Sequence, residues 1–389
     1  MRPVRIILYR MKRKRIGILG GTFHPVHNGH ILLAEHARTV LSLDTVLFLI
    51  DRVPPHKEMS DGASTEERLK MLQLAVENRD GFEVETMELY REGKSYSYDT
   101  LRELNTRLPD SDLYFLMGSD MLRSFSTWYN PKGISELCTL VCTERLGQSG
   151  GEADTAVSLK ALYGTRTILL DSVSDLSSTE VRMHIANALP ITDMVPPSVA
   201  LEIYTHGLYQ PEPIRAYYTK LQDHLTEKRL RHTAGVIQTA IELAAHYGAD
   251  AKKAQIAALL HDCAKYVSEE DLNRMSHDTE KILPVLHSEV GAILASTEYG
   301  VSDPEILQAI RLHTTGDANM SLLDKIIYLS DMIEPSRSYP GVELLRCDGD
   351  INDRVLKALT HCVNFLEKKG GKIHPATYRA IQYLHHQEE

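Results

Sequence analysis

The first half of the chain alternates short apolar runs with amphipathic segments. Strands are predicted over residues 15–19, 45–50, 82–85, 113–117, 139–143 and 167–170, and helices over 65–78 and 98–107. A further helix is predicted after His30, where the apolar residues recur at helical spacing, namely Ile31, Leu32, Ala34, Ala37 and Leu41. This alternation predicts an α/β domain, in which an open parallel sheet has helices on both faces and binds ligands at the carboxyl ends of its strands.

The second half is nearly all helical in pattern, so we expect an all-α domain there. Asp303 and Pro304 have the character of an N-cap and a first helical residue, and Gly316 that of a helix stop. The predicted organisation is an N-terminal extension (1–14), an α/β domain (15–209), a linker (210–216) and an all-α domain (217–389). The glycine-rich segment 147–153 is expected to be a flexible surface loop.

Composition narrows the range of partners. The formal net charge is −10 over 389 residues, which argues against nucleic acid and against a membrane surface. No apolar run approaches the roughly 18 residues that a membrane span needs. The five cysteines are odd in number and lack zinc-ribbon spacing, so we expect reduced thiols in a cytoplasmic protein. The apolar centre of the N-terminal segment is too short for a signal peptide. A simpler interpretation is that Met11 is the natural start and that residues 1–10 are an extension without a structural role.

The segment from Gly20 to His30 has the chemistry of an anion site. Gly20 and Gly21 are expected to let the backbone turn sharply and approach phosphate oxygens. The helix that follows points free N–H groups and the positive end of its dipole at the turn. His27 and His30 stand three residues apart, on one helix face. We therefore interpret the segment as a site for a nucleoside triphosphate.

The tetrapeptide His27-Asn28-Gly29-His30 resembles the H-x-G-H motif of the nucleotidyltransferase superfamily. The resemblance implies a Rossmann-like domain in which both histidines contact the triphosphate at the reacting phosphates. His24 departs from the pattern, because the superfamily usually has Asp or Asn there.

A second segment, 176–182, permits two interpretations. Ser177 and Glu180 have the spacing of a capping box, which needs no function. The segment also resembles the superfamily's I-S-S-T-x-x-R motif, which binds ATP phosphates, and Arg182 supplies its arginine.

Further motifs resemble those of the bacterial nicotinate mononucleotide adenylyltransferases. These motifs are Val53-Pro54-Pro55-His56-Lys57, Ser95-Tyr96-Ser97-Tyr98-Asp99-Thr100-Leu101 and Gly118-Ser119-Asp120, with the sole tryptophan at Trp128. The resemblance implies ATP contacts from Gly20, Gly21, Thr22, Phe23, His27, His30, Gly118, Asp120, Ser177, Ser178, Thr179 and Arg182. It implies mononucleotide contacts from Lys57, Tyr98, Thr100 and Trp128, although Trp128 could instead be a core residue.

The implied reaction joins nicotinate mononucleotide to the adenylyl group of ATP, with Mg²⁺ as cofactor. The mononucleotide phosphate attacks the α-phosphorus in line and pyrophosphate leaves, so catalysis consists of positioning and charge neutralisation. His27, His30 and Arg182 are the expected catalytic residues. A pantetheine-phosphate adenylyltransferase is the alternative, against which the Pro54-to-Lys57 segment and Trp128 argue.

The helical half contains six residues typical of metal ligands. They are His232, His261, Asp262, His287, His313 and Asp331, most of them within apolar helical runs. Buried polar groups without partners are costly, whereas a metal satisfies them. Imidazole with carboxylate suits Fe, Mn or Zn, and six ligands exceed the need of one tetrahedral ion. We therefore predict a two-metal centre.

The adjacent pair His261-Asp262 resembles the defining motif of the HD phosphohydrolase superfamily. The segments around all six ligands are similar to those of the bacterial HD family of symmetrical diadenosine tetraphosphate hydrolases. That resemblance implies a di-iron centre, or Mn in its place, and cleavage of diadenosine tetraphosphate into two ADP. Arg229 and Lys265 are candidates for holding phosphates, and a surface or salt-bridge role is the alternative for both. Hydrolysis of alarmones, cyclic dinucleotides or nucleoside monophosphates, and a nucleotide-sensing role, remain open. The expected partners are ATP and the two named substrates, and the protein is a possible homo-oligomer.

Overall fold

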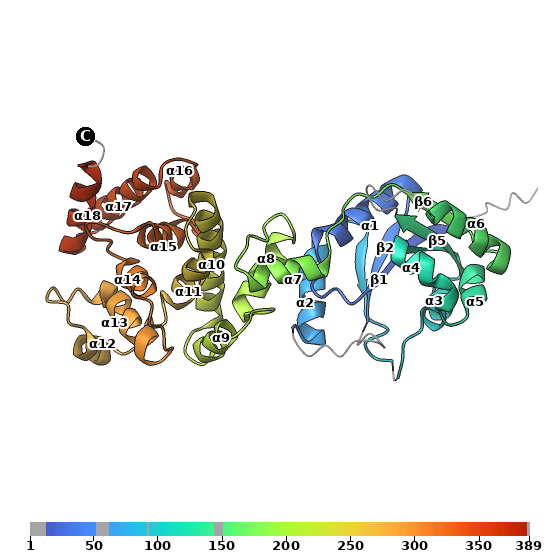
Figure 1. Cartoon of the computed structure of the whole chain (residues 1–389), viewed down its shortest axis with the longest axis horizontal. Helices are drawn as coiled ribbons and strands as arrows, with labels where there is room; N and C mark the ends of the chain where they lie inside the picture. Colours follow the sequence, from blue (N-terminus) through green and yellow to red (C-terminus); the bar gives the residue numbers. More distant parts are fainter. Residues whose placement is uncertain (1–12, 52–61, 92, 144–150, 387–389) are drawn as a thin grey trace, which may run out of the picture. The chain divides into compact units, whose positions relative to one another are not determined.

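The structure, a computed structural model, describes residues 13–51, 62–91, 93–143 and 151–386 (Figure 1). The chain divides into two compact units. The first, here named the sheet unit, contains residues 1–181 and 194–196. The second, the helical unit, contains residues 182–193 and 197–389. The expected combination of an α/β domain and an all-α domain is confirmed.

A six-stranded parallel sheet organises the sheet unit. Its strands are β1 (Lys14–Gly21), β2 (Thr45–Ile50), β3 (Phe82–Glu85), β4 (Ser111–Gly118), β5 (Cys138–Thr143) and β6 (Thr167–Leu170). Their order in the sheet is β3-β2-β1-β4-β5-β6. The chain thus builds outward from β1 in one direction and then from β4 in the other. In sheets of this kind ligands bind where the direction reverses, beyond the carboxyl ends of β1 and β4.

All six predicted strands are present, three of them with the predicted bounds. β1, β4 and β5 are each longer than predicted because residues at their ends pair with a neighbouring strand. Gly20 and Gly21 pair with Leu49 and Ile50, for example, and Gly118 pairs with Thr143. Apolar periodicity cannot detect such residues, because hydrogen bonding within a sheet does not require an apolar side chain.

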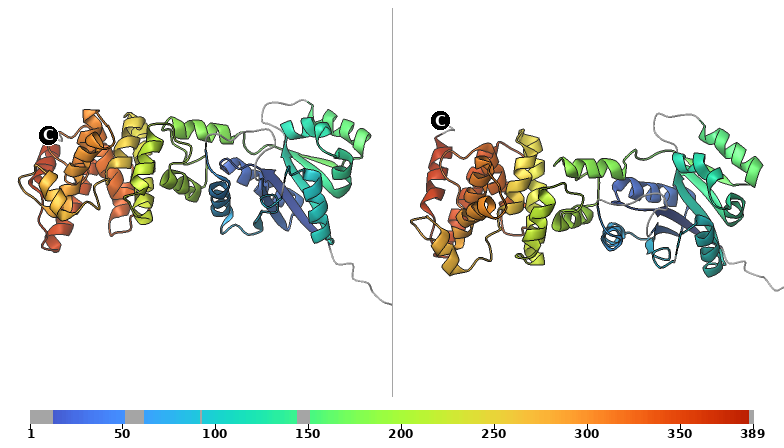
Figure 2. Two further views of the ribbon diagram at one scale, coloured as in Figure 1. Left: turned by 90° about the horizontal axis from the view of Figure 1, so that it is seen from below. Right: turned by 60° about the horizontal axis from the view of Figure 1, so that its bottom comes forward.

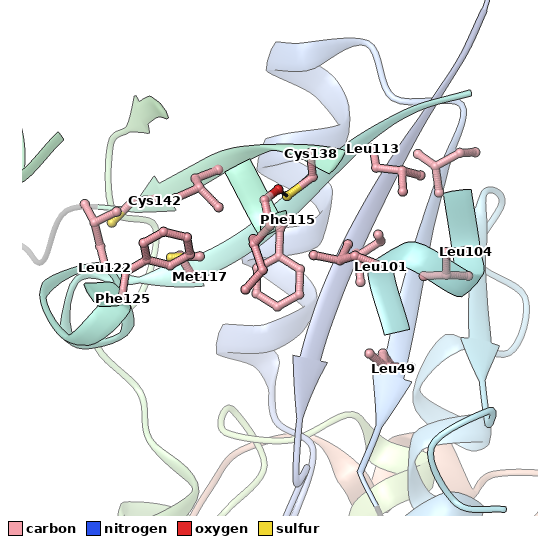
Figure 3. Packing of buried hydrophobic residues seen from close by; sticks show 14 of the residues in the cluster. Leu49, Leu101, Leu104, Leu113, Phe115, Met117, Leu122, Phe125, Cys138 and Cys142 are labelled. Atoms are coloured by element: carbon pink, nitrogen blue, oxygen red, sulfur yellow. Dashed lines mark hydrogen bonds between the residues drawn. The ribbon is translucent and has the colours of Figure 1, made fainter. Parts of the chain in front are cut away.

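Helices cover both faces of the sheet (Figure 1, Figure 2). They are α1 (Asn28–Leu41), α2 (Thr65–Val76), α3 (Ser97–Arg107), α4 (Ser119–Ser124), the short 3₁₀ helix η1 (Phe125–Thr127), α5 (Pro131–Leu137) and α6 (Glu152–Tyr163). Figure 3 shows the core between the sheet and α3 to α5, where Leu101 and Leu104 meet Phe115 and Leu113. On the other face Ile31, Ala34, Ala37 and Leu41 of α1 are buried, whereas Leu32 is 41% exposed.

The prediction of a loop over residues 147–153 is wrong for its last two residues, which are helical. Residues 147–150 lie outside the described residues, but α6 begins at Glu152. Acidic side chains in the first turn stabilise a helix because they interact favourably with its dipole, and Glu152 and Asp154 both lie in the first turn of α6. The Glu152 carboxylate is buried and accepts a hydrogen bond from Arg123 at 2.7 Å.

The helical unit contains the C-terminal helices. They are α8 (Pro197–His206), α9 (Ile214–Gln222), α10 (Glu227–Tyr247), α11 (Ala251–Leu260), α12 (Glu269–Met275), α13 (Leu283–Thr297), α14 (Pro304–Leu312), α15 (Leu322–Ile333), α16 (Val342–Arg346), α17 (Ile351–Lys368) and α18 (Pro375–His385). The long helix α10 packs against α8, α11 and α15, and α14 packs against α11, α13 and α15. The first two turns of α10 lie close to the end of α11, where Arg229 and His232 approach Asp262.

The predicted start of one helix is confirmed. Asp303 caps α14 by accepting a hydrogen bond from the N–H of Glu305, and Pro304 is the first helical residue. The helix ends at Leu312, before Gly316, which has a φ of 60° and donates its N–H to the Leu312 carbonyl. Glycine is suited to this left-handed conformation.

The expected linker at 210–216 stays a prediction. Gln210 is buried and its side chain accepts a hydrogen bond from Gln255, so the packing of the helical unit already includes this residue. The helix α7 (Ser178–Ala186) begins in the sheet unit and continues among residues grouped with the helical unit.

None of the helices in the described residues has the length and apolar character of a membrane span. All five cysteines are free.

Replacing Leu101 by Ala tests the core beneath the sheet. Leu101 is fully buried, and a cavity of this kind costs about 2–5 kcal/mol of unfolding free energy. Urea denaturation followed by the fluorescence of Trp128 measures the change in the sheet unit alone, because this is the sole tryptophan. Leu162→Ala is the control: this side chain is 66% exposed, and its loss is expected to change stability by less than about 0.5 kcal/mol. Equal effects from the two variants would contradict the described core.

Candidate functional sites

The turn after β1 differs from the expected glycine turn. Gly20 and Gly21 are extended and belong to β1, so the sharp turn predicted for them is wrong. The chain turns instead at Phe23, which has a φ of 46°, and at a cis peptide bond between His24 and Pro25. Hydrogen bonding to β2 keeps the glycines in the sheet. The Phe23 ring is buried and lies edge-on to the His30 ring, with centroids 5.0 Å apart.

His27 and His30 form a close pair at the start of α1. Their ring centroids are 3.7 Å apart, and His27 is the N-cap residue of the helix. The backbone N–H of His27 donates to Nδ1 of His30 at 3.2 Å. Because Nδ1 of His30 accepts, a neutral His30 has its proton on Nε2, which is then available as a donor.

Both imidazoles are neutral near pH 7. Burial lowers the pKa of His27 to about 4. Burial and the neighbouring His27 together lower the pKa of His30 well below its ordinary value. The pair therefore offers hydrogen-bond donors to an anion without itself changing charge in the physiological range.

Gly29 is required by close packing around this pair. A Cβ at Gly29 would lie 3.0 Å from Nδ1 and 3.1 Å from Cε1 of His27, and 3.2 Å from Oγ of Ser174. These separations are shorter than ordinary van der Waals contact. A side chain at this position would therefore displace the His27 ring or the Ser174 hydroxyl.

Arg68 supports the loop, and sequence reasoning did not identify it. Its side chain is fully buried, and its guanidinium donates to the Thr22 carbonyl at 2.6 Å and to the Asp51 carbonyl at 3.1 Å. It thereby ties the segment after β1 to the segment after β2. The residue lies within a predicted amphipathic helix, where an arginine usually faces solvent, so its spacing carried no signal.

The start of α7 lies against the same loop. The Ser177 hydroxyl accepts from the Glu180 N–H at 3.2 Å, as the capping-box interpretation predicts. The Ser178 hydroxyl donates to the Pro25 carbonyl at 2.9 Å, which places this helix start beside the segment leading to His27. Thr179 and Arg182 follow within the next turn of α7.

At the end of β4, Gly118 is the N-cap of α4. The Ser119 hydroxyl donates to the Thr143 carbonyl at 3.1 Å and joins this end to that of β5. The Asp120 carboxylate is 2.7 Å from the Arg123 guanidinium, and its side chain is 67% exposed. Gly118 has open space where a Cβ would lie.

The expected mononucleotide residues differ in their surroundings. Lys57, with the whole Pro54-to-Lys57 motif, lies outside the described residues. The Thr100 hydroxyl is buried, donates to Glu88 at 2.5 Å and accepts from Arg91 at 2.6 Å, so its hydrogen bonds are internal. Its contact with a mononucleotide stays a prediction.

Two aromatic residues of this group are only partly buried. Tyr98 packs against the sheet core and lies 6.1 Å from the Tyr129 ring, between centroids. Trp128 packs edge-on against Phe115 at 5.8 Å and near Phe125 at 5.4 Å. Trp128 thus contacts the core but is only partly buried, and its contact with a mononucleotide stays a prediction.

The helical unit brings all six expected metal ligands together. His232 lies on α10, His287 on α13 and Asp331 on α15, while His261-Asp262 and His313 directly follow α11 and α14. Ligand atoms of His232, His261 and Asp262 lie within 4.8 Å of one another, as do those of two further overlapping trios. The other trios are His261, His313 and Asp331, and Asp262, His287 and His313.

Asp262 lies between two pairs of imidazoles. Its Oδ2 atom is 3.4 Å from Nε2 of His261 and 3.9 Å from Nε2 of His232. Its Oδ1 atom is 3.2 Å from Nε2 of His287 and 3.7 Å from Nε2 of His313. Asp331 adds a second carboxylate on the first side, with Oδ1 3.0 Å from Nε2 of His232. One carboxylate oxygen thus faces each half of the cluster.

Hydrogen bonds on the far sides of the rings orient these imidazoles. Nδ1 of His261 donates to the Ala258 carbonyl at 2.6 Å, and Nδ1 of His313 to the Ile310 carbonyl at 2.7 Å. Nδ1 of His232 bonds to the Glu334 carboxylate at 3.1 Å. A proton on Nδ1 leaves a lone pair on Nε2, which is the tautomer that binds a metal.

The donor set fits divalent or trivalent metal ions. Nε2 of His232, Nε2 of His261 and Oδ1 of Asp262 are buried and make no hydrogen bond among the described residues. Burial lowers the pKa of His287 to about 4, so this ring is neutral. Burial alone would raise the pKa of Asp262, but the surrounding imidazoles hold it well below its ordinary value. Neutral nitrogen and ionised oxygen donors suit Fe, Mn or Zn.

Basic side chains surround the cluster. Arg229 donates to Oδ2 of Asp262 at 2.7 Å, and Nζ of Lys265 lies 3.1 Å from Nε2 of His287. Arg337, which sequence reasoning did not identify, forms an ion pair with Asp331. It lies six residues after Asp331, and an arginine in a segment that follows a helix gives no signal of this contact in the sequence. These cations thus lie directly beside the carboxylates and imidazoles of the cluster.

Known proteins match the two halves separately. Residues 18–184 match the cytidylyltransferase-like family, and residues 229–336 match the HD domain family. A probable nicotinate-nucleotide adenylyltransferase of Listeria monocytogenes is 40% identical over 199 residues, which make up 51% of this chain and 98% of that protein. A symmetrical bis(5'-nucleosyl)-tetraphosphatase of Halalkalibacterium halodurans is 44% identical over 173 residues, or 42% of this chain and 92% of that protein.

A solved structure that is similar to the second half is also known. It is that of a predicted HD superfamily hydrolase involved in NAD metabolism from Clostridium acetobutylicum, which is 38% identical. The match covers 44% of this chain and 97% of that protein, with a TM-score of 0.42.

The neutral state of His27 predicts a loss of stability in acid. The unfolded chain binds a proton near pH 6.5, whereas the folded site binds it only near pH 4, so unfolding takes up a proton between these values. This contribution is absent above pH 6.5 and reaches about 2 kcal/mol of destabilisation at pH 5. Urea denaturation at pH 7 and pH 5, followed by Trp128 fluorescence, measures it. His27→Gln is expected to lose this part of the pH dependence; an unchanged pH dependence in the variant would contradict a buried neutral His27.

Proposed function

Because the chain belongs to the cytidylyltransferase-like family over its first half and to the HD family over its second, we propose that it carries two nucleotide-processing activities. The sheet unit transfers the adenylyl group of ATP to nicotinate mononucleotide, which gives nicotinate adenine dinucleotide and pyrophosphate. The helical unit hydrolyses diadenosine tetraphosphate into two molecules of ADP. The dinucleotide product of the first reaction and the substrate of the second share the adenosine 5'-phosphate group.

The observation that carries the transferase proposal is the neutral imidazole pair at the end of β1. A phosphate oxygen of the mononucleotide bonds to the α-phosphorus of ATP while the bond to the bridging oxygen of pyrophosphate breaks. His27 and His30 donate hydrogen bonds to the oxygens where negative charge accumulates. Fixed donors of this kind need no reorganisation during the reaction, and Gly29 and Arg68 keep them in place.

The phosphates of ATP have a second set of donors at the start of α7. Ser177, Thr179 and Arg182 extend from this helix start, which the Ser178 bond to Pro25 holds beside the loop. Helix N-termini favour anions. Mg²⁺ enters such sites mainly on substrate phosphates rather than in a cage of protein ligands, so we assign it to the nucleotide.

Relatives support the choice of nicotinate mononucleotide as acceptor. The Listeria protein is named as a nicotinate-nucleotide adenylyltransferase and matches along almost its whole length. Tyr98 and the accessible side of Trp128 supply aromatic surfaces for a pyridine ring, and Lys57 of the Pro-Pro-His-Lys motif supplies a cation for the carboxylate or phosphate.

The observation that carries the hydrolase proposal is the position of Asp262 between two pairs of imidazoles. Two metal ions would be held by these residues, with His232, His261 and Asp331 near Oδ2 of Asp262 and His287 and His313 near Oδ1. When bound, two such ions supply a water nucleophile and neutralise phosphate charge. Arg229 and Lys265 hold phosphate oxygens of the tetraphosphate bridge. The ligand set suits iron or manganese.

The tetraphosphate is favoured over other HD substrates by the Halalkalibacterium relative, which is named as a symmetrical tetraphosphatase. Alarmones, cyclic dinucleotides and nucleoside monophosphates are the alternative substrates. A sensor without catalysis is the alternative role, but it would not require a complete set of ligands for two ions.

Replacing His30 by Ala tests the transferase site. Loss of one fixed donor typically lowers kcat by roughly 10²–10³, and we expect this range for pyrophosphate release with ATP and nicotinate mononucleotide. His36→Ala, on the same helix, is the control and is expected to retain activity. A loss below about threefold for His30→Ala would rule out the assigned role, and a wild-type preference for nicotinamide mononucleotide would change the assigned acceptor.

Hydrolysis of diadenosine tetraphosphate by the wild type and by His261→Ala tests the helical unit. Symmetrical cleavage gives only ADP, whereas asymmetrical cleavage gives AMP and ATP, and chromatography separates these products. Loss of a metal ligand is expected to lower the rate by at least about 100-fold, and the transferase activity of the same preparation controls for intact protein. A wild type that binds but does not cleave the tetraphosphate would support the sensor instead.

A further inference from the structure

Glu334 is a buried carboxylate next to the proposed metal centre. It directly follows α15, and its side chain is 1% exposed. Its Oε1 atom lies 3.1 Å from Nδ1 of His232. The Ser336 hydroxyl donates to Oε1 at 2.5 Å, and the Ser336 N–H donates to Oε2 at 2.7 Å. Serine thus fixes the carboxylate in one orientation, with Oε1 toward His232.

This partner differs from those of the neighbouring imidazoles. His261 and His313 donate to backbone carbonyls, which are uncharged, whereas His232 faces an ionised carboxylate. A carboxylate at Nδ1 fixes the tautomer of a histidine and makes its Nε2 a stronger metal ligand.

Gly235 provides the space for this carboxylate. It lies on α10 one turn after His232, and a Cβ at this position would lie 2.5 Å from Oε2 of Glu334. Glycine within a helix costs about 1 kcal/mol relative to alanine. The chain therefore has the less helix-stabilising residue at a position where a methyl group would collide with Glu334.

We propose that Glu334, accommodated by Gly235, is a positioning residue that orients His232 and strengthens its binding of one of the two metal ions. The inference rests on the proposed two-metal centre and adds to it. Glu334 touches neither substrate nor metal in this scheme; it acts through His232. Of the two proposed metal positions, only the one that His232 would share with His261 and Asp331 depends directly on Glu334.

Metal titration of the full chain tests the role without an activity assay. The protein is stripped of metal, and Mn²⁺ binding is followed by calorimetry, with metal content measured after dialysis. The wild type is expected to bind two equivalents. In Glu334→Gln, which keeps the shape and loses the charge, one equivalent is expected to bind 10- to 100-fold more weakly, while the other is unchanged. Gly235→Ala is expected to weaken the same equivalent.

Gly291→Ala is the matched control for the glycine variant. Gly291 also lies within a helix, α13, but a Cβ there would meet its neighbours only at 3.5 Å or more, which is ordinary contact. This variant is expected to bind both equivalents as the wild type does. Circular dichroism melting of the metal-free proteins separates folding from metal binding, since Gly235→Ala removes a helical glycine.

The outcomes distinguish the inference from the proposal on which it depends. Wild-type protein that binds no Mn²⁺ would contradict the two-metal centre itself. Two equivalents of unchanged affinity in Glu334→Gln, or equal weakening of both, would overturn the role of Glu334 and leave the centre intact. Weakening in Gly291→Ala equal to that in Gly235→Ala would remove the steric argument.

Discussion

A carboxylate that is 2% exposed stays ionised inside a helical bundle only if donors or positive charges surround it, and this constraint on Asp262 organises the helical unit. Arg229 donates to one of its oxygens, and four imidazoles from four separate segments of the chain converge on both oxygens with Nε2 lone pairs that suit a cation beside the carboxylate. Because His261 and Asp262 follow α11 directly, this helix ends at the cluster, beside ligands carried by α10, α13 and α15 and by the segment after α14. The packing of the bundle and the composition of its centre therefore depend on the same residue.

The two units use histidine in opposite ways. In the sheet unit, Nδ1 of His30 accepts a backbone N–H, so its Nε2 is a donor suited to phosphate oxygens. In the helical unit, Nδ1 of His261 and of His313 donates to a carbonyl, so Nε2 is a lone pair suited to a cation. The local backbone determines which tautomer is present, because a helix start offers N–H groups and a helix end offers carbonyls.

The sequence predicted the helices, strands and metal-type residues better than it predicted the buried side chains that hold them in place. Strand positions followed from apolar runs, and the six metal-type residues followed from polar residues within apolar helices. Arg68 could not be predicted, because its buried guanidinium bonds to backbone carbonyls, which carry no residue identity. The turn assigned to Gly20 and Gly21 was wrong because pairing with β2 keeps them extended, and Phe23 makes the turn instead. A glycine in the sequence shows that the backbone can adopt unusual φ and ψ angles there, but it does not show that the folded chain does so.

Gly235 and Glu334 lie 99 positions apart, yet they share one volume of space. A side chain larger than hydrogen at the first position is compatible only with a shorter or displaced side chain at the second. Over evolutionary time the two positions are therefore expected to change together. A descendant chain that lost the carboxylate would no longer be constrained to keep the glycine, and the helix would gain stability from almost any replacement.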